Sequence, residues 1–321
     1  MLPLYPDIKP YRQEYLPVGD GHELYLECSG DPQGLPVLFV HGGPGGGSSP
    51  KSRCFFDPNR YHIIVYDQRG AGRSRPHASI EHNTTTHLIE DIEAIRKHLA
   101  VDQWVLFGGS WGATLSLLYS QRYSERVSAL ILRGVFLCRQ RDIDWFYRDG
   151  ASRIYPDFWE DFQALVPEGE DVIEAYDRQL NGDNELARLS AAKAWCAWEA
   201  RCATLRPNLT LFEDAVDAHH SLAMARIENH YFLNDGFIRP NQILEDAHRL
   251  AGIPGIIVHG RFDMVCTLEN ALLLHEQWQD GELHIIRDAG HSAHDAGNRD
   301  ALLRATADIA DLLRPSDQES Y

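Results

Sequence analysis

Short apolar runs alternate with helical patterns in the first third of the chain, and this alternation restricts the fold more than any other feature. Three runs, at 36–40, 62–66 and 104–108, have the length of buried strands. Apolar residues three and four apart mark a helix over 86–99, and a second helical pattern follows 110. Strands joined by helices pair in parallel through right-handed crossovers. The sequence therefore predicts an α/β protein with a mostly parallel sheet flanked by helices.

This alternation of strand and helix patterns stops after residue 136 and resumes later in the chain. The intervening segment is rich in Trp, Tyr, Phe, Asp and Glu, and it shows helical patterns without apolar strand runs. Strand patterns reappear at 255–260 and 282–288, and a helical pattern ends the chain. The simplest organisation is an α/β core formed by 1–136 and 241–321, with a helical cap inserted at 137–240.

Charge and composition exclude several classes of protein. The 321 residues include 30 basic and 47 acidic ones, and the net charge is −17. Nucleic acid and anionic membranes require clustered Lys and Arg, so neither is expected as a partner, whereas an amine-bearing substrate is favoured.

The N-terminal stretch lacks the pattern of a signal peptide, and the apolar stretch at 127–138 is too short to span a membrane. The six cysteines and the histidines show no zinc spacing. We expect a cytoplasmic protein without metal or other cofactor.

A serine between glycines lies where a strand pattern gives way to a helical one. The stretch Gly108-Gly109-Ser110-Trp111-Gly112 matches G-x-S-x-G, the nucleophile elbow of the α/β-hydrolase fold. Small neighbours let the backbone turn sharply and expose the serine hydroxyl, and the helix that follows directs N–H groups toward a developing negative charge. The alternative interpretation of the same sequence is a glycine-rich turn with a serine that caps the helix. The strand before and the helix after it favour Ser110 as a nucleophile.

The partners of such a serine follow it in the order acid, then histidine. Asp263 comes after the strand at 255–260, and His291 comes after the strand at 282–288, so both are expected at carboxyl ends of strands. We expect His291 to take the Ser110 proton and Asp263 to orient the imidazole. The small residues beside His291 favour it over neighbouring loop residues of the same types, which are His294, Asp288 and Asp295.

A second glycine-rich run supplies a candidate oxyanion hole. The sequence HGGPGGG at 41–47 directly follows the strand at 36–40, as the HGGG-type motif of hydrolases does. A flexible linker has a similar composition, but this run is joined to a strand rather than placed between domains. We expect the backbone N–H groups of Gly43 and Trp111 to form the oxyanion hole. The neighbouring polar residues for which we expect only structural roles are His41, Asp67 and Arg69.

These motifs and others resemble the proline iminopeptidases, serine peptidases of the α/β-hydrolase fold. The glycine run, the elbow, HGRFDMVC and AGHSA occur in many hydrolases, whereas DGASR, WEA and ENHYF lie in the inserted segment and are specific to this family. The resemblance implies that the chain removes N-terminal proline from peptides and that the insertion forms a cap over the active site.

The resemblance also implies how the substrate is recognised. The family's amine-binding glutamates correspond to Glu199 of WEA and Glu228 of ENHYF. Two carboxylates distinguish a free amino group from an internal amide, because only the amino group carries a positive charge. Phe136 and Tyr147 are candidate walls for the proline ring. Without the resemblance, the default explanation for the two glutamates is a pair of solvated helix faces, and aromatic residues in a cap often serve only for packing. The alternatives are an esterase, lipase-like or amide hydrolase of the same fold, or a non-catalytic binding protein.

Overall fold

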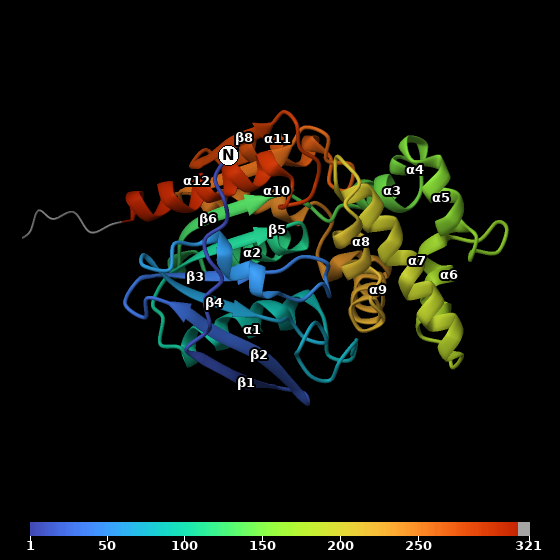
Figure 1. Ribbon diagram of the computed structural model, residues 1–321, viewed down its shortest axis with the longest axis horizontal. Coiled ribbons are helices and arrows are strands. Elements are labelled where there is room, and N and C mark those ends of the chain that lie inside the picture. Colours follow the sequence, from blue (N-terminus) through green and yellow to red (C-terminus); the bar gives the residue numbers. More distant parts are fainter. Residues whose placement is uncertain (314–321) are drawn as a thin grey trace, which may run out of the picture.

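An eight-stranded sheet forms the centre of the computed structural model, which describes residues 1–313 (Figure 1). The strand order is β1-β2-β4-β3-β5-β6-β7-β8. β2 pairs antiparallel with β1 and with β4, and all other neighbours are parallel. The strands are β1 (Arg12–Gly19), β2 (His22–Gly30), β3 (Leu35–Val40), β4 (Tyr61–Tyr66), β5 (Trp104–Gly109), β6 (Val127–Arg133), β7 (Gly255–Gly260) and β8 (Gly281–Ile286).

Helices cover both faces of this sheet. α1 (Thr85–His98), α2 (Trp111–Arg122) and α11 (Leu268–Gln277) contribute to the apolar cluster on one face, and α12 (Ala296–Leu312) contributes to the cluster on the other. Successive residues of the central strands point to opposite faces, so Leu106 packs on the first side and Phe107 on the second. Burial on both faces explains why these strands are nearly continuous apolar runs.

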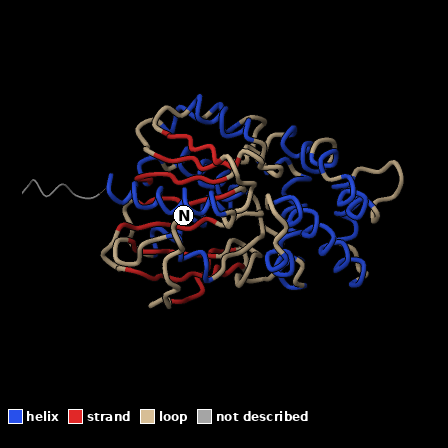
Figure 2. Tube along the Cα trace, turned by 45° about the horizontal axis from the view of Figure 1, so that its top comes forward, coloured by secondary structure: helices blue, strands red, loops and turns tan. Residues whose placement is uncertain are grey.

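The segment between β6 and β7 is helical. Seven helices occupy most of it. They gather beyond one end of the strands (Figure 2), and the arrows of β5 and β6 point toward them (Figure 1). These helices are α3 (Gln140–Tyr147), α4 (Ala151–Ile154), α5 (Pro156–Gln163), α6 (Val172–Leu180), α7 (Glu185–Ala203), α8 (Leu209–Ala215) and α9 (Ala218–Leu233), and the short α10 (Gln242–Glu245) follows them. The predicted mostly parallel sheet with an inserted helical region is confirmed. Among the described residues, no helix is long and apolar enough to cross a membrane.

The edge strand β1 lies in a stretch for which the sequence pattern predicts no strand. It pairs with β2 alone, and none of its residues is fully buried. An edge strand of this kind lacks the apolar run that identifies the buried strands, because no layer of helices covers both of its faces.

Candidate active site

The backbone at Ser110 is held in an unusual conformation between β5 and α2. Its φ of 58° and ψ of −125° lie in a region of backbone conformation that residues other than glycine rarely adopt. Its neighbours must be small: a Cβ atom on Gly108 would lie 2.2 Å from the Gly112 carbonyl oxygen, and one on Gly112 would lie 2.1 Å from the Val40 carbonyl oxygen. The glycines of the motif are therefore required by the close approach of β3, β5 and α2.

Asp263 and His291 meet beside the carboxyl ends of β7 and β8. The Oδ2 atom of Asp263 lies 2.7 Å from Nδ1 of His291. The backbone N–H groups of Val265 and Cys266 donate to Oδ1 of Asp263 at 3.0 and 2.8 Å. Burial favours a higher pKa for Asp263, but His291 and these donors outweigh it and hold the pKa below its ordinary value. The buried carboxylate is therefore ionised and fixed in position.

The other nitrogen of His291 faces a guanidinium group. Nη1 of Arg133 lies 3.0 Å from Nε2 of His291 and donates to the His291 carbonyl oxygen at 2.9 Å. Because a guanidinium can only donate, Nε2 is an acceptor, and the ring proton resides on Nδ1, which donates to Asp263. Burial lowers the pKa of His291, and the charge of Arg133 lowers it further, against the opposing effect of Asp263. His291 is thus a neutral imidazole in the tautomer that a general base at Nε2 requires.

Ser110, Arg133 and His291 line one cavity of about 370 Å³. Gly42 and Gly43 line it as well, so the glycine-rich run borders the serine. The run is held by His41, whose buried Nε2 accepts from the Gln68 N–H at 2.9 Å. The Trp111 N–H is the first of α2, where backbone donors have no partner within the helix. Both predicted oxyanion donors therefore belong to segments next to Ser110.

Two glutamates from the inserted helices border a second, smaller cavity beside Ser110. Glu199 lies on α7 and Glu228 on α9, and both line this cavity together with Tyr147. Glu228 is 1% exposed, and its Oε2 accepts from Trp195 Nε1 at 2.7 Å. The Tyr147 hydroxyl lies 3.4 Å from Oε1 of Glu199. Two carboxyl groups, one fully buried and one half-buried, have thus been brought together from separate helices beside Ser110.

Both carboxyl groups resist ionisation in this site. Burial raises the pKa of Glu199 to about 7. Burial and the neighbouring charge of Glu199 raise the pKa of Glu228 well above its ordinary value. In the absence of a cation, the pair therefore retains a proton near neutral pH, and a cation placed between the two groups would displace it.

Comparison with known proteins identifies the family. A family model described as the alpha/beta hydrolase fold matches residues 36–297. A proline iminopeptidase of Xanthomonas citri is 50% identical over 313 residues, which cover 97% of this chain and 100% of that protein. The chain belongs to the proline iminopeptidase family. A second member, from Arabidopsis thaliana, is 48% identical over 97% of this chain and 83% of its own length. The predicted assignment to serine aminopeptidases of the α/β-hydrolase fold is confirmed.

Solved structures of distant relatives agree on the fold. A bromoperoxidase from Bacillus anthracis superposes with a TM-score of 0.67 at 17% identity, covering 94% of this chain and 100% of that one. A proline iminopeptidase-related protein from Thermus thermophilus gives 0.63 at 21% identity, covering 95% of this chain and 100% of that one. At such identities the likeness shows the α/β-hydrolase fold alone.

In this proline iminopeptidase family member, the wall of the smaller cavity includes both predicted residues and residues that no sequence pattern predicted. Phe136 and Tyr147 line the cavity as expected. Phe232 also lines it and stacks edge-on against Phe136 at 5.8 Å between ring centres. Phe232 comes four residues after Glu228 on α9, so it lies on the same helix face, and this spacing is a signal for it. Other missed residues include Phe146 in the smaller cavity and Arg133 beside His291.

The remaining polar residues near the site have structural contacts. Asp295 accepts from the Gly290 N–H at 2.7 Å and so shapes the loop that carries His291. Asp67 accepts from the Ser48 N–H and from Arg73, both at 2.8 Å. Arg69 forms a buried ion pair with Asp91, with Nε 2.7 Å from Oδ2. These contacts agree with the structural roles expected for Asp67 and Arg69.

Proposed function

We propose that the chain releases proline from the N-terminus of peptides through an acyl-enzyme on Ser110, beneath a cap formed by residues 137–240. One observation carries this proposal: the carboxyl pair of the half-buried Glu199 and the buried Glu228 borders the same small cavity as Ser110. A pair of carboxyl groups in an enclosed site is costly unless a cation compensates it. The N-terminal amino group of a peptide is such a cation.

The chemistry assigned to the core residues is that of a serine peptidase. The Ser110 oxygen attacks the prolyl carbonyl carbon while Nε2 of His291 takes the hydroxyl proton, and Asp263 stabilises the resulting imidazolium. The Gly43 and Trp111 N–H groups receive the negative charge of the tetrahedral intermediate. His291 then delivers the proton to the leaving amine, and the C–N bond breaks. Water hydrolyses the prolyl ester by the same steps, with Ser110 as the leaving group.

Arg133 must release Nε2 of His291 before the first proton transfer, because one lone pair accepts only one hydrogen bond. The guanidinium lies beside the larger cavity, which also borders Ser110 and His291. We assign this larger cavity to the part of the peptide that follows proline. The aromatic residues of the smaller cavity, Phe136 and Tyr147 among them, form the walls around the proline ring.

The decisive experiment compares an amine-bearing amide with a neutral ester. Glu199→Gln and Glu228→Gln should each lower kcat/KM for proline β-naphthylamide by about two to four orders of magnitude, since breaking a buried charge pair costs roughly 3–5 kcal/mol. Turnover of p-nitrophenyl acetate, which has no amino group, should change far less. Glu185→Gln is the matched control, because Glu185 lies exposed in the first turn of α7.

Two outcomes would contradict the proposal. Equal losses on the ester and the amide would mean that the glutamates act on the fold or on the general chemistry rather than on the amine. Efficient cleavage of an N-acetylproline amide would mean that a free amino group is not required. Either result would favour the alternative, an esterase or amide hydrolase with a different acyl specificity.

A further inference from the structure

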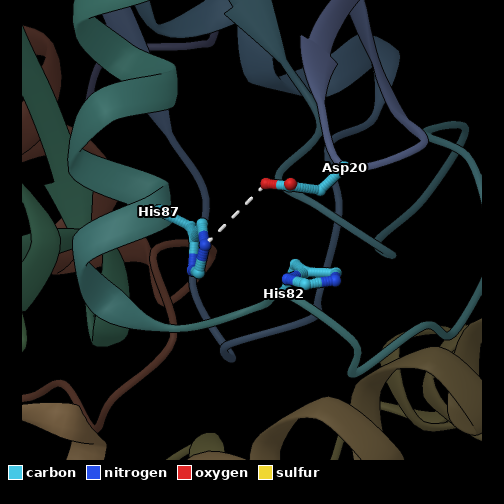
Figure 3. Close-up of side chains that lie close together, drawn as sticks. All are labelled: Asp20, His82 and His87. Carbon is cyan, nitrogen blue, oxygen red and sulfur yellow. Dashed lines mark ion pairs between the residues drawn. The ribbon is translucent and has the colours of Figure 1, made fainter.

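Three potential metal ligands converge at the edge of the core, near the turn between β1 and β2 (Figure 3). Asp20 lies in that turn, His82 lies in the loop before α1, and His87 lies in the first turn of α1. One ligand atom from each residue can be chosen so that all three lie within 4.8 Å of one another. Nε2 of His87 faces Oδ2 of Asp20 at 3.9 Å (Figure 3). Ligand atoms around one tetrahedral zinc ion lie about 3.3 Å apart, so the most distant pair would have to close by up to about 1.5 Å through side-chain rotation.

The orientation of His87 matches that of a metal ligand. Its Nδ1 lies 2.8 Å from the Thr84 hydroxyl, which fixes the ring and turns Nε2 toward Asp20. A hydrogen bond at one ring nitrogen is the usual way in which proteins orient a histidine whose other nitrogen binds metal. All three side chains are exposed or half-buried, so an ion from solution can reach them.

A buried guanidinium group holds the three ligand-bearing segments in place. Arg69 donates to the carbonyl oxygen of Val18, just before the turn, at 3.1 Å and to the carbonyl oxygen of His82 at 2.9 Å. It also binds both carboxylate oxygens of Asp91, one helical turn after His87, at 2.7 and 2.9 Å. The segments are thus ordered without metal, so binding an ion requires little further ordering.

The positive charge of Arg69 is balanced within the core. Its Nη1 lies 3.5 Å from Oδ2 of Asp20, but the carboxylate of Asp91 is closer and forms two hydrogen bonds with the same guanidinium. Asp20 therefore keeps an accessible carboxylate that is available to a cation.

We propose that Asp20, His82 and His87 bind a divalent transition-metal ion, with Zn²⁺ the preferred occupant. Two imidazoles and one carboxylate are ligands that suit zinc, and water completes the coordination. None of the three residues lines the cavities at Ser110. The ion acts as a clamp between the β1–β2 turn and the start of α1, and it stabilises the fold without entering the peptidase reaction.

Zinc titration of the chelator-treated full chain tests this site. Wild type should bind one Zn²⁺ by isothermal titration calorimetry, and its unfolding temperature should rise by about 5 °C at a free zinc concentration near one hundred times Kd. Asp20→Asn, His82→Asn and His87→Ala should each weaken binding by at least about tenfold. Asparagine is chosen at positions 20 and 82 because both residues have positive φ, which asparagine tolerates.

A matched control and a folding control accompany these variants. His284→Ala removes an imidazole that lies 3.4 Å from Glu282 but belongs to no group of three potential ligands among the described residues. This variant should bind zinc as wild type does. Unfolding temperatures measured in excess chelator should agree between wild type and the variants, so that any loss of binding is assigned to the ligands. Absence of binding to wild type up to about 1 mM zinc, or unchanged binding in the three ligand variants, would overturn the proposal.

Discussion

At the scale of single residues, the candidate site holds charged groups whose protonation states depend on their neighbours. His291 is neutral because its Nε2 accepts from Arg133 and its Nδ1 donates to Asp263. Burial raises the pKa of both Glu199 and Glu228, and the charge of Glu199 raises that of Glu228 further, which favours one retained proton near neutral pH. In the proposed function, these states govern the binding of an amine-bearing substrate and its dependence on pH.

Replacing Ser110 with alanine should abolish turnover and leave the fold intact. The proposed reaction passes through a covalent ester on this oxygen, and loss of one member of a serine triad leaves a fraction of about 10⁻⁴ to 10⁻⁶ of the activity. We would measure kcat for proline β-naphthylamide together with the urea midpoint of unfolding. Retention of more than a few per cent of wild-type kcat would exclude Ser110 as the nucleophile.

The pH profiles of the two substrates should differ on the acid side. The pKa of Glu199 is raised to about 7, so the pair gains protons and loses its attraction for an amine as the pH falls through that range. The pKa of His291 lies below its ordinary value of 6.5, so general-base activity persists to lower pH. In kcat/KM, the prolyl amide should therefore lose activity at higher pH than p-nitrophenyl acetate. Identical acid limbs for both substrates would argue against recognition of the amine by the glutamates.

At the scale of secondary-structure elements, the site depends on how closely β3, β5 and α2 approach. The first turn of α2 lies against the end of β3, where the glycine-rich run begins, and only glycine at 112 allows this approach. The position of the proposed oxyanion donors therefore depends on the packing of a helix against a strand.

Gly112→Ala should reduce both stability and activity. The new Cβ would lie 2.1 Å from the Val40 carbonyl oxygen, so β3 and α2 must separate, at a cost of roughly 1–3 kcal/mol in the free energy of unfolding and with displacement of the glycine run. Gly252→Ala is the control, because its Cβ meets no atom within 4 Å and only its φ of +81° is unfavourable. Urea unfolding and kcat/KM would be measured for both variants. Equal kcat/KM in the two would show that this close approach does not position the site.

At the scale of the whole molecule, the chain carries a net charge of −17 and forms its candidate site where the inserted helices meet the sheet. We expect the negative field to raise the local concentration of cations, and we propose that the carboxyl pair then selects among them at short range.

Salt should therefore slow the cleavage of a cationic substrate. Between about 10 and 300 mM NaCl, kcat/KM for proline β-naphthylamide should fall by up to about tenfold, because salt screens the attraction between the protein and the amine. The value for neutral p-nitrophenyl acetate should stay nearly constant. An equal salt dependence for both substrates would point to an effect on the protein rather than on the charge of the substrate.

Patterns among neighbouring residues predicted much of the fold and the candidate triad from the sequence alone. Short apolar runs predicted the central strands at 36–40, 62–66 and 104–108, because strands buried on both faces consist mostly of apolar residues. The glycines around Ser110 predicted the elbow because a sharp turn excludes side chains. Chain order placed Asp263 and His291 after neighbouring strands, and the structure brings them to 2.7 Å.

The tertiary structure decided what local patterns leave open. The contact of Arg133 with His291 joins residues 158 positions apart in the chain, and no local sequence pattern predicts it. The burial of Glu199 and Glu228 depends on how α7 and α9 pack, since a glutamate on a helix is ordinarily solvated. The ligand cluster at Asp20 likewise forms only because Arg69 draws a turn, a loop and a helix together. Such contacts arise from long-range packing and electrostatics, whereas strands, helices and sharp turns follow from the sterics and periodicity of a few adjacent residues.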